Sequence, residues 1–326
     1  MTQLLIAGII LMSIVLIKSA DVVIVAIRRI SKETHTGIFA LSAVILAIGT
    51  SFPELSVGIT SALEGNSVLA LGAVAGSNIA NLSLVVGLTT LVAGKVRVHP
   101  NFLKRDVVIA LFAGVLPLLL LIDGELNRVD GLILIAVYIA YAGSFFRQRF
   151  SQIAKEYEEE ESFVYRFYRK FNHIDAQKRS EFGKLFVGIA LMLFSADMIV
   201  RFASELAFMA NIPQLVIGLI VIAIGTSLPE FTFSLESVRE HEPSMFFGNI
   251  LGSTIANSTL IIGIVSLINP IEIHETGRFT LAAISFVAIY LMFWYFIRTK
   301  HRLDRWEAGI LLLFYATFLI LEFRGV

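Results

Sequence analysis

Apolar residues follow one another along this chain in runs of roughly 20, the length of a helix that crosses the hydrocarbon core of a bilayer. Ten such runs predict ten membrane helices, over residues 3–27, 36–63, 67–93, 106–122, 129–146, 183–208, 212–238, 244–269, 279–297 and 305–322. One longer polar segment, 147–182, divides them into groups of five. The pattern predicts an all-α polytopic membrane protein with five-helix halves, 1–146 and 183–326, joined by a connector.

Composition supports the same fold class and excludes several functions. Hydrophobic residues make up 56% of the 326 residues and charged residues only 16%, too few to cover a soluble domain of this size. The chain has no cysteine, which excludes disulfides, thiolate nucleophiles and cysteine-ligated metals. A net charge of zero without a basic domain argues against a nucleic-acid partner. We expect the lipid bilayer as its environment, and we predict neither a protein partner nor a cofactor.

Positive charges gather on alternate loops. The loops after runs 1, 3, 5, 7 and 9 hold 21 of the 26 lysines and arginines. The other face holds only Arg128, Arg201, Arg278 and Arg324, and Lys18 lies within run 1. Because cytoplasmic loops are enriched in Lys and Arg, we expect a protein of the cell membrane with both termini extracellular and the connector 147–182 in the cytoplasm.

The two halves repeat each other at an offset of 176 residues, without a gap between Ser19 and Gly87. The run AIGTSFPE at 47–54 recurs as AIGTSLPE at 223–230, and the segment around Gly76-Ser77 recurs around Gly252-Ser253. Five helices is an odd number, so the halves enter the membrane in opposite directions. Such inverted repeats are typical of secondary transporters, which bind their substrates at the midplane and work by alternating access.

Each half carries one glutamate deep inside an apolar run, Glu54 and Glu230, at equivalent positions of the repeat. A carboxylate at the centre of a bilayer is costly unless it is paired, hydrated or bound to a cation. Runs 2, 3, 7 and 8 contain no Lys or Arg at comparable depth. The natural partners are therefore metal cations or protons.

Oxygen atoms of other groups surround each glutamate in the sequence. Pro53 and Pro229 lack the amide hydrogen of a regular helix, so we expect runs 2 and 7 to be broken just before them, with backbone carbonyls exposed to a cavity. Hydroxyl and amide side chains share helical faces at spacings of about four residues: Thr50, Ser51, Thr226, Ser227, Ser77, Asn81, Ser253 and Asn257. Such oxygens suit calcium or sodium rather than zinc or copper.

The paired GTSFPE and GTSLPE motifs, each followed by a GS-x-IAN segment, resemble the two alpha-repeats of the calcium/cation antiporter superfamily, closest to its sodium/calcium exchanger branch. The resemblance covers nearly the whole chain. It implies that Glu54 and Glu230, with carbonyls near Thr50 and Thr226, bind calcium. It further implies that sodium alternates with calcium at the following groups: Ser51, Ser77, Ser227, Ser253 and the carbonyls of Ala47 and Ala223.

Departures from the family pattern refine this hypothesis. Proton-coupled members usually carry Gly-Asn where this chain has Gly-Thr at Thr50 and Thr226. Potassium-dependent members and some prokaryotic members carry Asp at one of the positions held here by Asn81 and Asn257. With two carboxylates only, one calcium or two sodium ions neutralise the site. We therefore expect sodium/calcium exchange without obligatory potassium.

Three other functions remain alternatives. A proton/calcium exchanger would use the same two glutamates. An intramembrane hydrolase would need two carboxyls sharing a proton or basic residues that clamp a phosphate, and the repeated runs show neither arrangement, so we do not expect an enzyme. A passive channel would conduct without a counter-ion. Ion flux under separate sodium, potassium and pH gradients distinguishes these classes.

Overall fold

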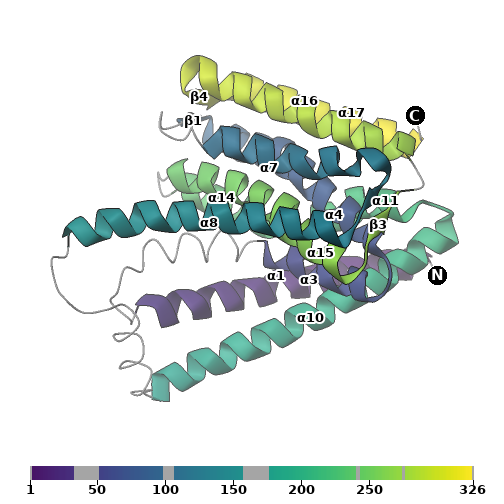
Figure 1. Ribbon diagram of the computed structural model, residues 1–326, viewed down its shortest axis with the longest axis horizontal. Coiled ribbons are helices and arrows are strands. Elements are labelled where there is room, and N and C mark those ends of the chain that lie inside the picture. The colour runs from purple at the N-terminus through teal and green to yellow at the C-terminus, as the bar shows by residue number, and fades with distance from the viewer. Residues whose placement is uncertain are drawn as a thin grey trace.

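The computed structural model describes residues 2–32, 51–97, 106–156, 176–239, 243–273 and 276–324, and nearly all of them are helical (Figure 1). The first half contains α1 (Thr2–Lys32), α3 (Phe52–Leu63), α4 (Ser67–Ala80), the π-helical η1 (Asn81–Val85), α5 (Val86–Ala93), β1 (Lys95–Arg97), α7 (Asp106–Leu120), the 3-10 turn η2 (Leu121–Asp123), β2 (Glu125–Leu126) and α8 (Arg128–Glu156).

The second half follows a similar order of elements. It contains α10 (Ala176–Ala210), α11 (Gln214–Ile217), the π-helical η3 (Gly218–Ile222), α12 (Ala223–Thr226), α13 (Leu228–Arg239), α14 (Pro243–Ile255), the π-helical η4 (Ala256–Ile261), α15 (Ile262–Ile268), β3 (Ile271–Glu272), α16 (Thr276–Lys300), β4 (Arg302–Asp304) and α17 (Arg305–Arg324).

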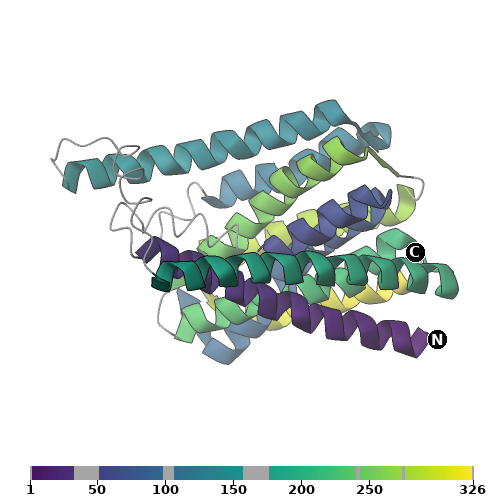
Figure 2. The same ribbon diagram turned by 90° about the horizontal axis from the view of Figure 1, so that it is seen from below.

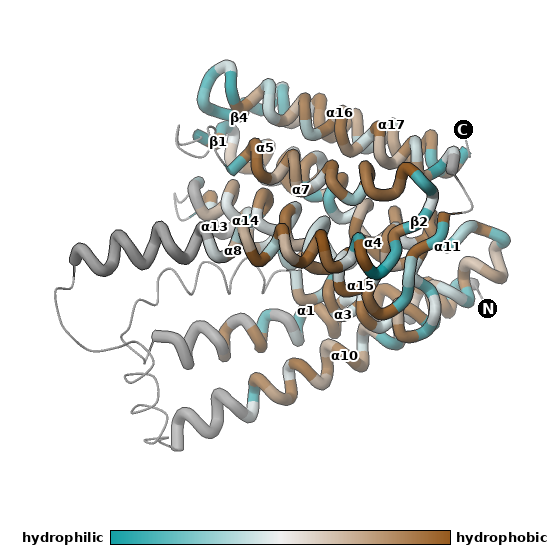
Figure 3. Tube along the Cα trace, viewed as in Figure 1, coloured by the Kyte–Doolittle hydropathy of each residue, from teal (hydrophilic) through white to brown (hydrophobic). Residues whose placement is uncertain are grey.

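Eight helices in the described part of the chain are long and apolar enough to cross a membrane, and their apolar lengths stand out in Figure 3. They match the predicted runs 1, 3, 4 and 6 to 10. Run 2, 36–63, falls largely outside the described residues, which resume at Ser51. Run 5, 129–146, corresponds to α8. The protein is thus a mostly helical membrane protein.

Helices extend into the predicted connector, 147–182, from both sides. α8 continues to Glu156 and α10 begins at Ala176. Polar residues such as Gln, Lys, Arg and Glu are good helix formers, so a helix continues after its apolar stretch has ended. Hydropathy therefore located the apolar part of these helices and not their ends.

Two short antiparallel ribbons lie at opposite ends of the helical bundle (Figure 1). β1 pairs with β4 at one end, and β2 pairs with β3 at the other. Both chain termini lie at the β2–β3 end, whereas α8 ends and α10 begins at the opposite end (Figures 1 and 2). Each ribbon therefore ties the first half of the chain to the second.

The helices divide into a buried centre and an outer layer. α4 and η1, with α14 and η4, are buried along most of their length. α1 and α10 run side by side at one edge of the bundle (Figure 2) and expose many apolar side chains. Exposed apolar surface on this scale suits contact with lipid chains. Arg201 of α10 forms an ion pair of 2.9 Å with Glu64, the C-cap residue of α3.

Candidate functional site

Glu54 lies in the first turn of α3 and is only 1% exposed. Ser51, three residues before Glu54, is not helical and has φ −85° and ψ 6°. Pro53 occupies the first turn of the helix. Proline suits this position because the first backbone amides of a helix have no intrahelical acceptor. α3 thus begins at the motif and carries the carboxylate in its first turn, where negative charge is favoured.

Glu230 occupies the equivalent place in the second half. α12 ends at Thr226 and α13 begins at Leu228, so Ser227 alone interrupts the helical run. Ser227 has φ −80° and ψ 0°, close to the values of Ser51. The structure therefore interrupts the helical run at a single residue before Pro229, the place at which a break was predicted. Glu230 lies in the first turn after it and is 0% exposed.

Ser77 joins the two motifs across the halves. Its Oγ lies 3.3 Å from Glu54 Oε1 and donates a hydrogen bond to it. The same Oγ lies 3.0 Å from Thr226 Oγ1 and 3.4 Å from the carbonyl oxygen of Ala223. Four predicted ligands from three elements, α3, α4 and α12, are thus brought together although up to 172 positions separate them in the chain.

Glycines permit this approach, because α4 crosses the η3–α12 segment at backbone contact. A Cβ atom added at Gly76 would lie 2.7 Å from the Ala223 Cβ and closer still to the carbonyl oxygen of Leu219. One turn away, Gly72 meets the Leu215 carbonyl in the same way. Small residues at such crossings let helices approach closely, which puts the Ser77 hydroxyl within reach of Thr226.

The two carboxylates are neighbours without a basic partner. They are close enough for the charge of Glu54 to act on Glu230, and the Ser253 hydroxyl lies beside Glu230. No lysine or arginine in the described part of the chain forms an ion pair with either glutamate. Two buried negative charges together are costly unless a cation neutralises them.

Buried polar atoms without a hydrogen-bond partner among the described residues occur at several of the predicted ligands, as well as elsewhere in the described chain. They include one oxygen of Glu54, both oxygens of Glu230, and atoms of Ser51, Ser227, Asn81 and Asn257. Native structures leave few such groups unsatisfied, and each one requires an explanation. An oxygen-lined site for a desolvated hard cation accounts for the oxygen atoms among them.

Not every predicted ligand is placed here. Ala47 and Thr50 lie outside the described residues. The Ala223 carbonyl accepts the backbone amide of Ser227 at 3.1 Å as well as approaching Ser77, so one of its two lone pairs is already engaged. Asn81 and Asn257, both 0% exposed, stand at the start of the π-helical segments η1 and η4.

The sequence reasoning missed Asn78 and Ser258, which extend the polar centre. Asn78 Nδ2 donates to Ser258 Oγ at 2.8 Å, and Asn257 Nδ2 donates to Asn78 Oδ1 at 3.2 Å. The position equivalent to Asn78 is Thr254, so a search for residues shared by the two halves passes over it. The available signal was its place next to Ser77 and three residues before Asn81.

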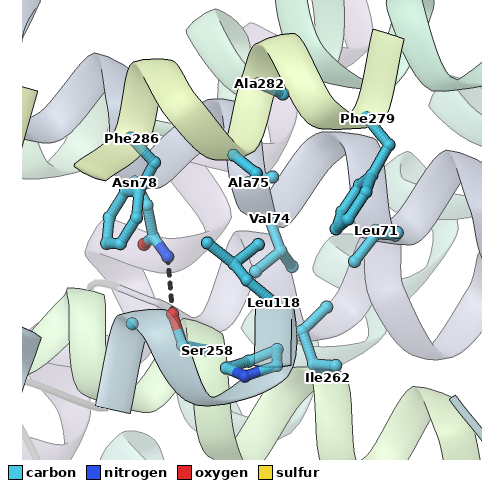
Figure 4. Close-up of a pocket in the computed structure, with 13 residues that line it drawn as sticks. Leu71, Val74, Ala75, Asn78, Leu118, Ser258, Ile262, Phe279, Ala282 and Phe286 are labelled. Atoms are coloured by element: carbon cyan, nitrogen blue, oxygen red, sulfur yellow. Dashed lines mark hydrogen bonds between the residues drawn. The ribbon is translucent and has the colours of Figure 1, made fainter. Parts of the chain in front are cut away.

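A small pocket of about 30 Å³ lies on the outer side of this pair, between α4, α7, α16 and η4 (Figure 4). Apart from Asn78 and Ser258, its labelled lining is apolar, including Val74, Phe279 and Phe286. It contains no carboxylate. Apolar side chains offer no oxygen ligands to a cation, so this pocket is not the candidate cation site.

The chain matches a family model described as "Sodium/calcium exchanger protein" over residues 4–147 and 180–324. It is 30% identical to "Sodium/calcium exchanger MaX1" of Methanosarcina acetivorans over 341 aligned residues, covering 94% of this chain and 95% of that protein. It is 31% identical to "Inner membrane protein YrbG" of Escherichia coli, covering 83% and 81% of the two chains.

Solved structures show the same fold. A structure of the sodium-calcium exchanger NCX_Mj, soaked with 10 mM Na+ and zero Ca2+, superposes with a TM-score of 0.65 at 24% identity. The superposition covers 98% of this chain and 99% of that one. At this identity the likeness concerns the arrangement of the helices.

Proposed function

The chain belongs to the sodium/calcium exchanger protein family, and on that premise we propose that it exchanges Ca2+ for Na+ across the cell membrane by alternating access. The observation that carries the proposal is the joining of two buried carboxylates, Glu54 and Glu230, with hydroxyl groups of both halves and no basic partner in the described part of the chain. Two buried carboxylates require cations to neutralise them, and every ligand that this cluster offers is an oxygen atom.

The charge of the site explains why two cations would compete for it. One calcium ion neutralises two carboxylates, and so do two sodium ions. Ser51, Ser77, Thr226, Ser227, Ser253, Asn81 and Asn257 add neutral oxygens, which calcium accepts among its six to eight ligands. We therefore propose exchange without an obligatory potassium site.

We also propose ten membrane helices arranged as two inverted repeats. Equivalent contacts support this arrangement. Gly87 packs against Ala308 and Leu312 between α5 and α17, and Gly263 packs against Gly131 and Ile135 between α15 and α8. The two contacts are equivalent under the repeat offset of 176: Gly87 corresponds to Gly263, and Ala308 and Leu312 correspond, within one residue, to Gly131 and Ile135. The ribbon β1–β4 is related to β3–β2 in a similar way.

The orientation follows from charge. We propose extracellular termini and a cytoplasmic connector, 147–182. Support comes from the position of both termini at one end of the bundle (Figure 1) and from the basic residues of β1 and β4 at the other. Cytoplasmic ends of membrane proteins are enriched in Lys and Arg.

The experiment is calcium uptake by proteoliposomes of the purified protein, with gradients of sodium, potassium and protons imposed one at a time. Outward sodium gradients at fixed pH should drive uptake of ⁴⁵Ca²⁺, in buffers with or without potassium, and protein-free vesicles give the baseline. Uptake driven by a pH gradient alone would favour the alternative, a proton/calcium exchanger that uses the same two glutamates. Calcium flux that needs no counter-ion would indicate a channel and contradict the proposal.

A further inference from the structure

We propose that Asn78 is a positioning residue that turns the side-chain carbonyl of Asn257 toward the transported cation. The inference rests on the proposed function. Asn78 follows Ser77 on α4, and its side chain points at Ser258 of η4, with its Nδ2 donating to the hydroxyl at 2.8 Å (Figure 4). Its Oδ1 accepts a hydrogen bond of 3.2 Å from Asn257 Nδ2. Asn78 thus holds one end of the Asn257 amide.

The other end of that amide is the group that matters for the cation. A primary amide is planar, so fixing its nitrogen fixes the direction of its oxygen. Asn257 is 0% exposed, and its Oδ1 has no hydrogen-bond partner in the described part of the chain. Asn257 lies one helical turn beyond Ser253, which lies beside Glu230. A buried carbonyl oxygen at this place is suited to a hard cation, whereas an amide nitrogen there would repel it.

Asn81, the asparagine of the first half that is equivalent to Asn257, is not held in this way by any described residue. The residue equivalent to Asn78 is Thr254, whose hydroxyl donates at 2.9 Å to the Ile250 carbonyl of its own helix. Asn81, the equivalent of Asn257, has no hydrogen-bond partner at either end of its amide among the described residues. One asparagine is therefore pre-oriented and the other is not, so the two halves contribute unequally to the site although their motifs match.

Pre-orientation predicts a loss of calcium affinity when the hydrogen bonds are removed. Asn78→Leu has a similar shape and cannot hold the amide. We expect it to raise the calcium concentration for half-maximal uptake roughly tenfold, the usual scale for a residue that orients a metal ligand, with a much smaller change in maximal rate. Ser258→Ala, which removes only the outer hydrogen bond, should act in the same direction more weakly. Thr254→Val is the matched control and should leave the affinity unchanged.

A double-mutant comparison separates positioning from packing. In an Asn257→Ala background, Asn78→Leu should produce no further loss of affinity, because the residue through which it acts is absent. Binding is read independently of transport as the rise in thermal unfolding temperature of the detergent-purified protein with added CaCl₂. The same pattern across variants is expected in both measurements.

Two results would overturn the inference. The first is a calcium affinity unchanged in Asn78→Leu. The second is a loss of affinity that is as large in the Asn257→Ala background as in the wild type, which indicates a packing effect. Should Asn78→Leu fail to fold, Ser258→Ala provides the same comparison. If calcium neither stabilised the wild-type protein nor was transported by it, that result would contradict the proposed function, and this inference with it.

Discussion

Replacing Gly76 with alanine tests how the site is assembled. The added Cβ would lie 2.7 Å from the Ala223 Cβ and closer to the Leu219 carbonyl oxygen. Carbon atoms pack at about 3.5–4.0 Å, so α4 and the η3–α12 segment must separate by about 1 Å. The neighbouring hydroxyl of Ser77 would then move from 3.0 Å to about 4 Å from Thr226 Oγ1, beyond hydrogen-bond distance.

The expected cost follows from this displacement. Overpacking at a helix crossing lowers the free energy of unfolding by about 1–3 kcal/mol. A displacement of about 1 Å in a functional site reduces rate by as much as 10²-fold. We therefore expect Gly76→Ala to fold with a lower unfolding temperature and to lose most of its sodium-driven calcium uptake in proteoliposomes.

The matched control is Gly309→Ala in α17. No atom lies within 4 Å of a Cβ added there, so the same substitution in another membrane helix should leave uptake unchanged. Unfolding temperature measured on each sample separates a displaced site from an unfolded protein. Wild-type calcium affinity and turnover in Gly76→Ala would refute the view that backbone contact at this glycine aligns Ser77 with the second half.

Two further predictions concern the polar centre. Ser77→Ala should weaken calcium affinity roughly tenfold, because the Ser77 hydroxyl contacts Glu54 and Thr226. The control is Ser83→Ala, which should keep wild-type affinity, because the buried Ser83 hydroxyl donates its hydrogen bond to the Ile79 carbonyl. Equal losses of affinity in both variants would contradict the assignment. Sodium-driven calcium uptake by the wild type should be the same after choline replaces potassium. Asn257→Asp adds a third buried charge that requires a cation, and should make calcium uptake depend on potassium or pH. A wild type that is inactive without potassium would refute the charge count.

The sequence predicted most of the helices that the structure describes and selected the residues of the candidate site. Apolar runs of membrane length are a strong signal, because lipid demands them along a whole helix. The repeat selected Glu54, Glu230 and Ser77, since a motif duplicated at a fixed offset marks positions that both halves share. The structure then shows Ser77 in contact with groups of both halves.

Features that depend on the packing of one half against the other were not predictable in this way. Three helices contain π-helical segments, η1, η3 and η4, which periodicity does not reveal because each alters the register of only one turn. Asn78 escaped because Thr254 replaces it in the second half. α8 and α10 extend beyond the predicted membrane runs because polar residues continue both helices.

Calcium uptake by Glu54→Gln and Glu230→Gln tests the central claim most directly. Each substitution keeps the shape of the side chain and removes half of the negative charge available to a divalent ion at the joined site. In sodium-loaded proteoliposomes at fixed pH, each folded variant should take up calcium no faster than protein-free vesicles, whereas Glu205→Gln, at an exposed position of α10, should retain wild-type uptake. Substantial sodium-driven calcium uptake by either folded variant, Glu54→Gln or Glu230→Gln, would contradict the account.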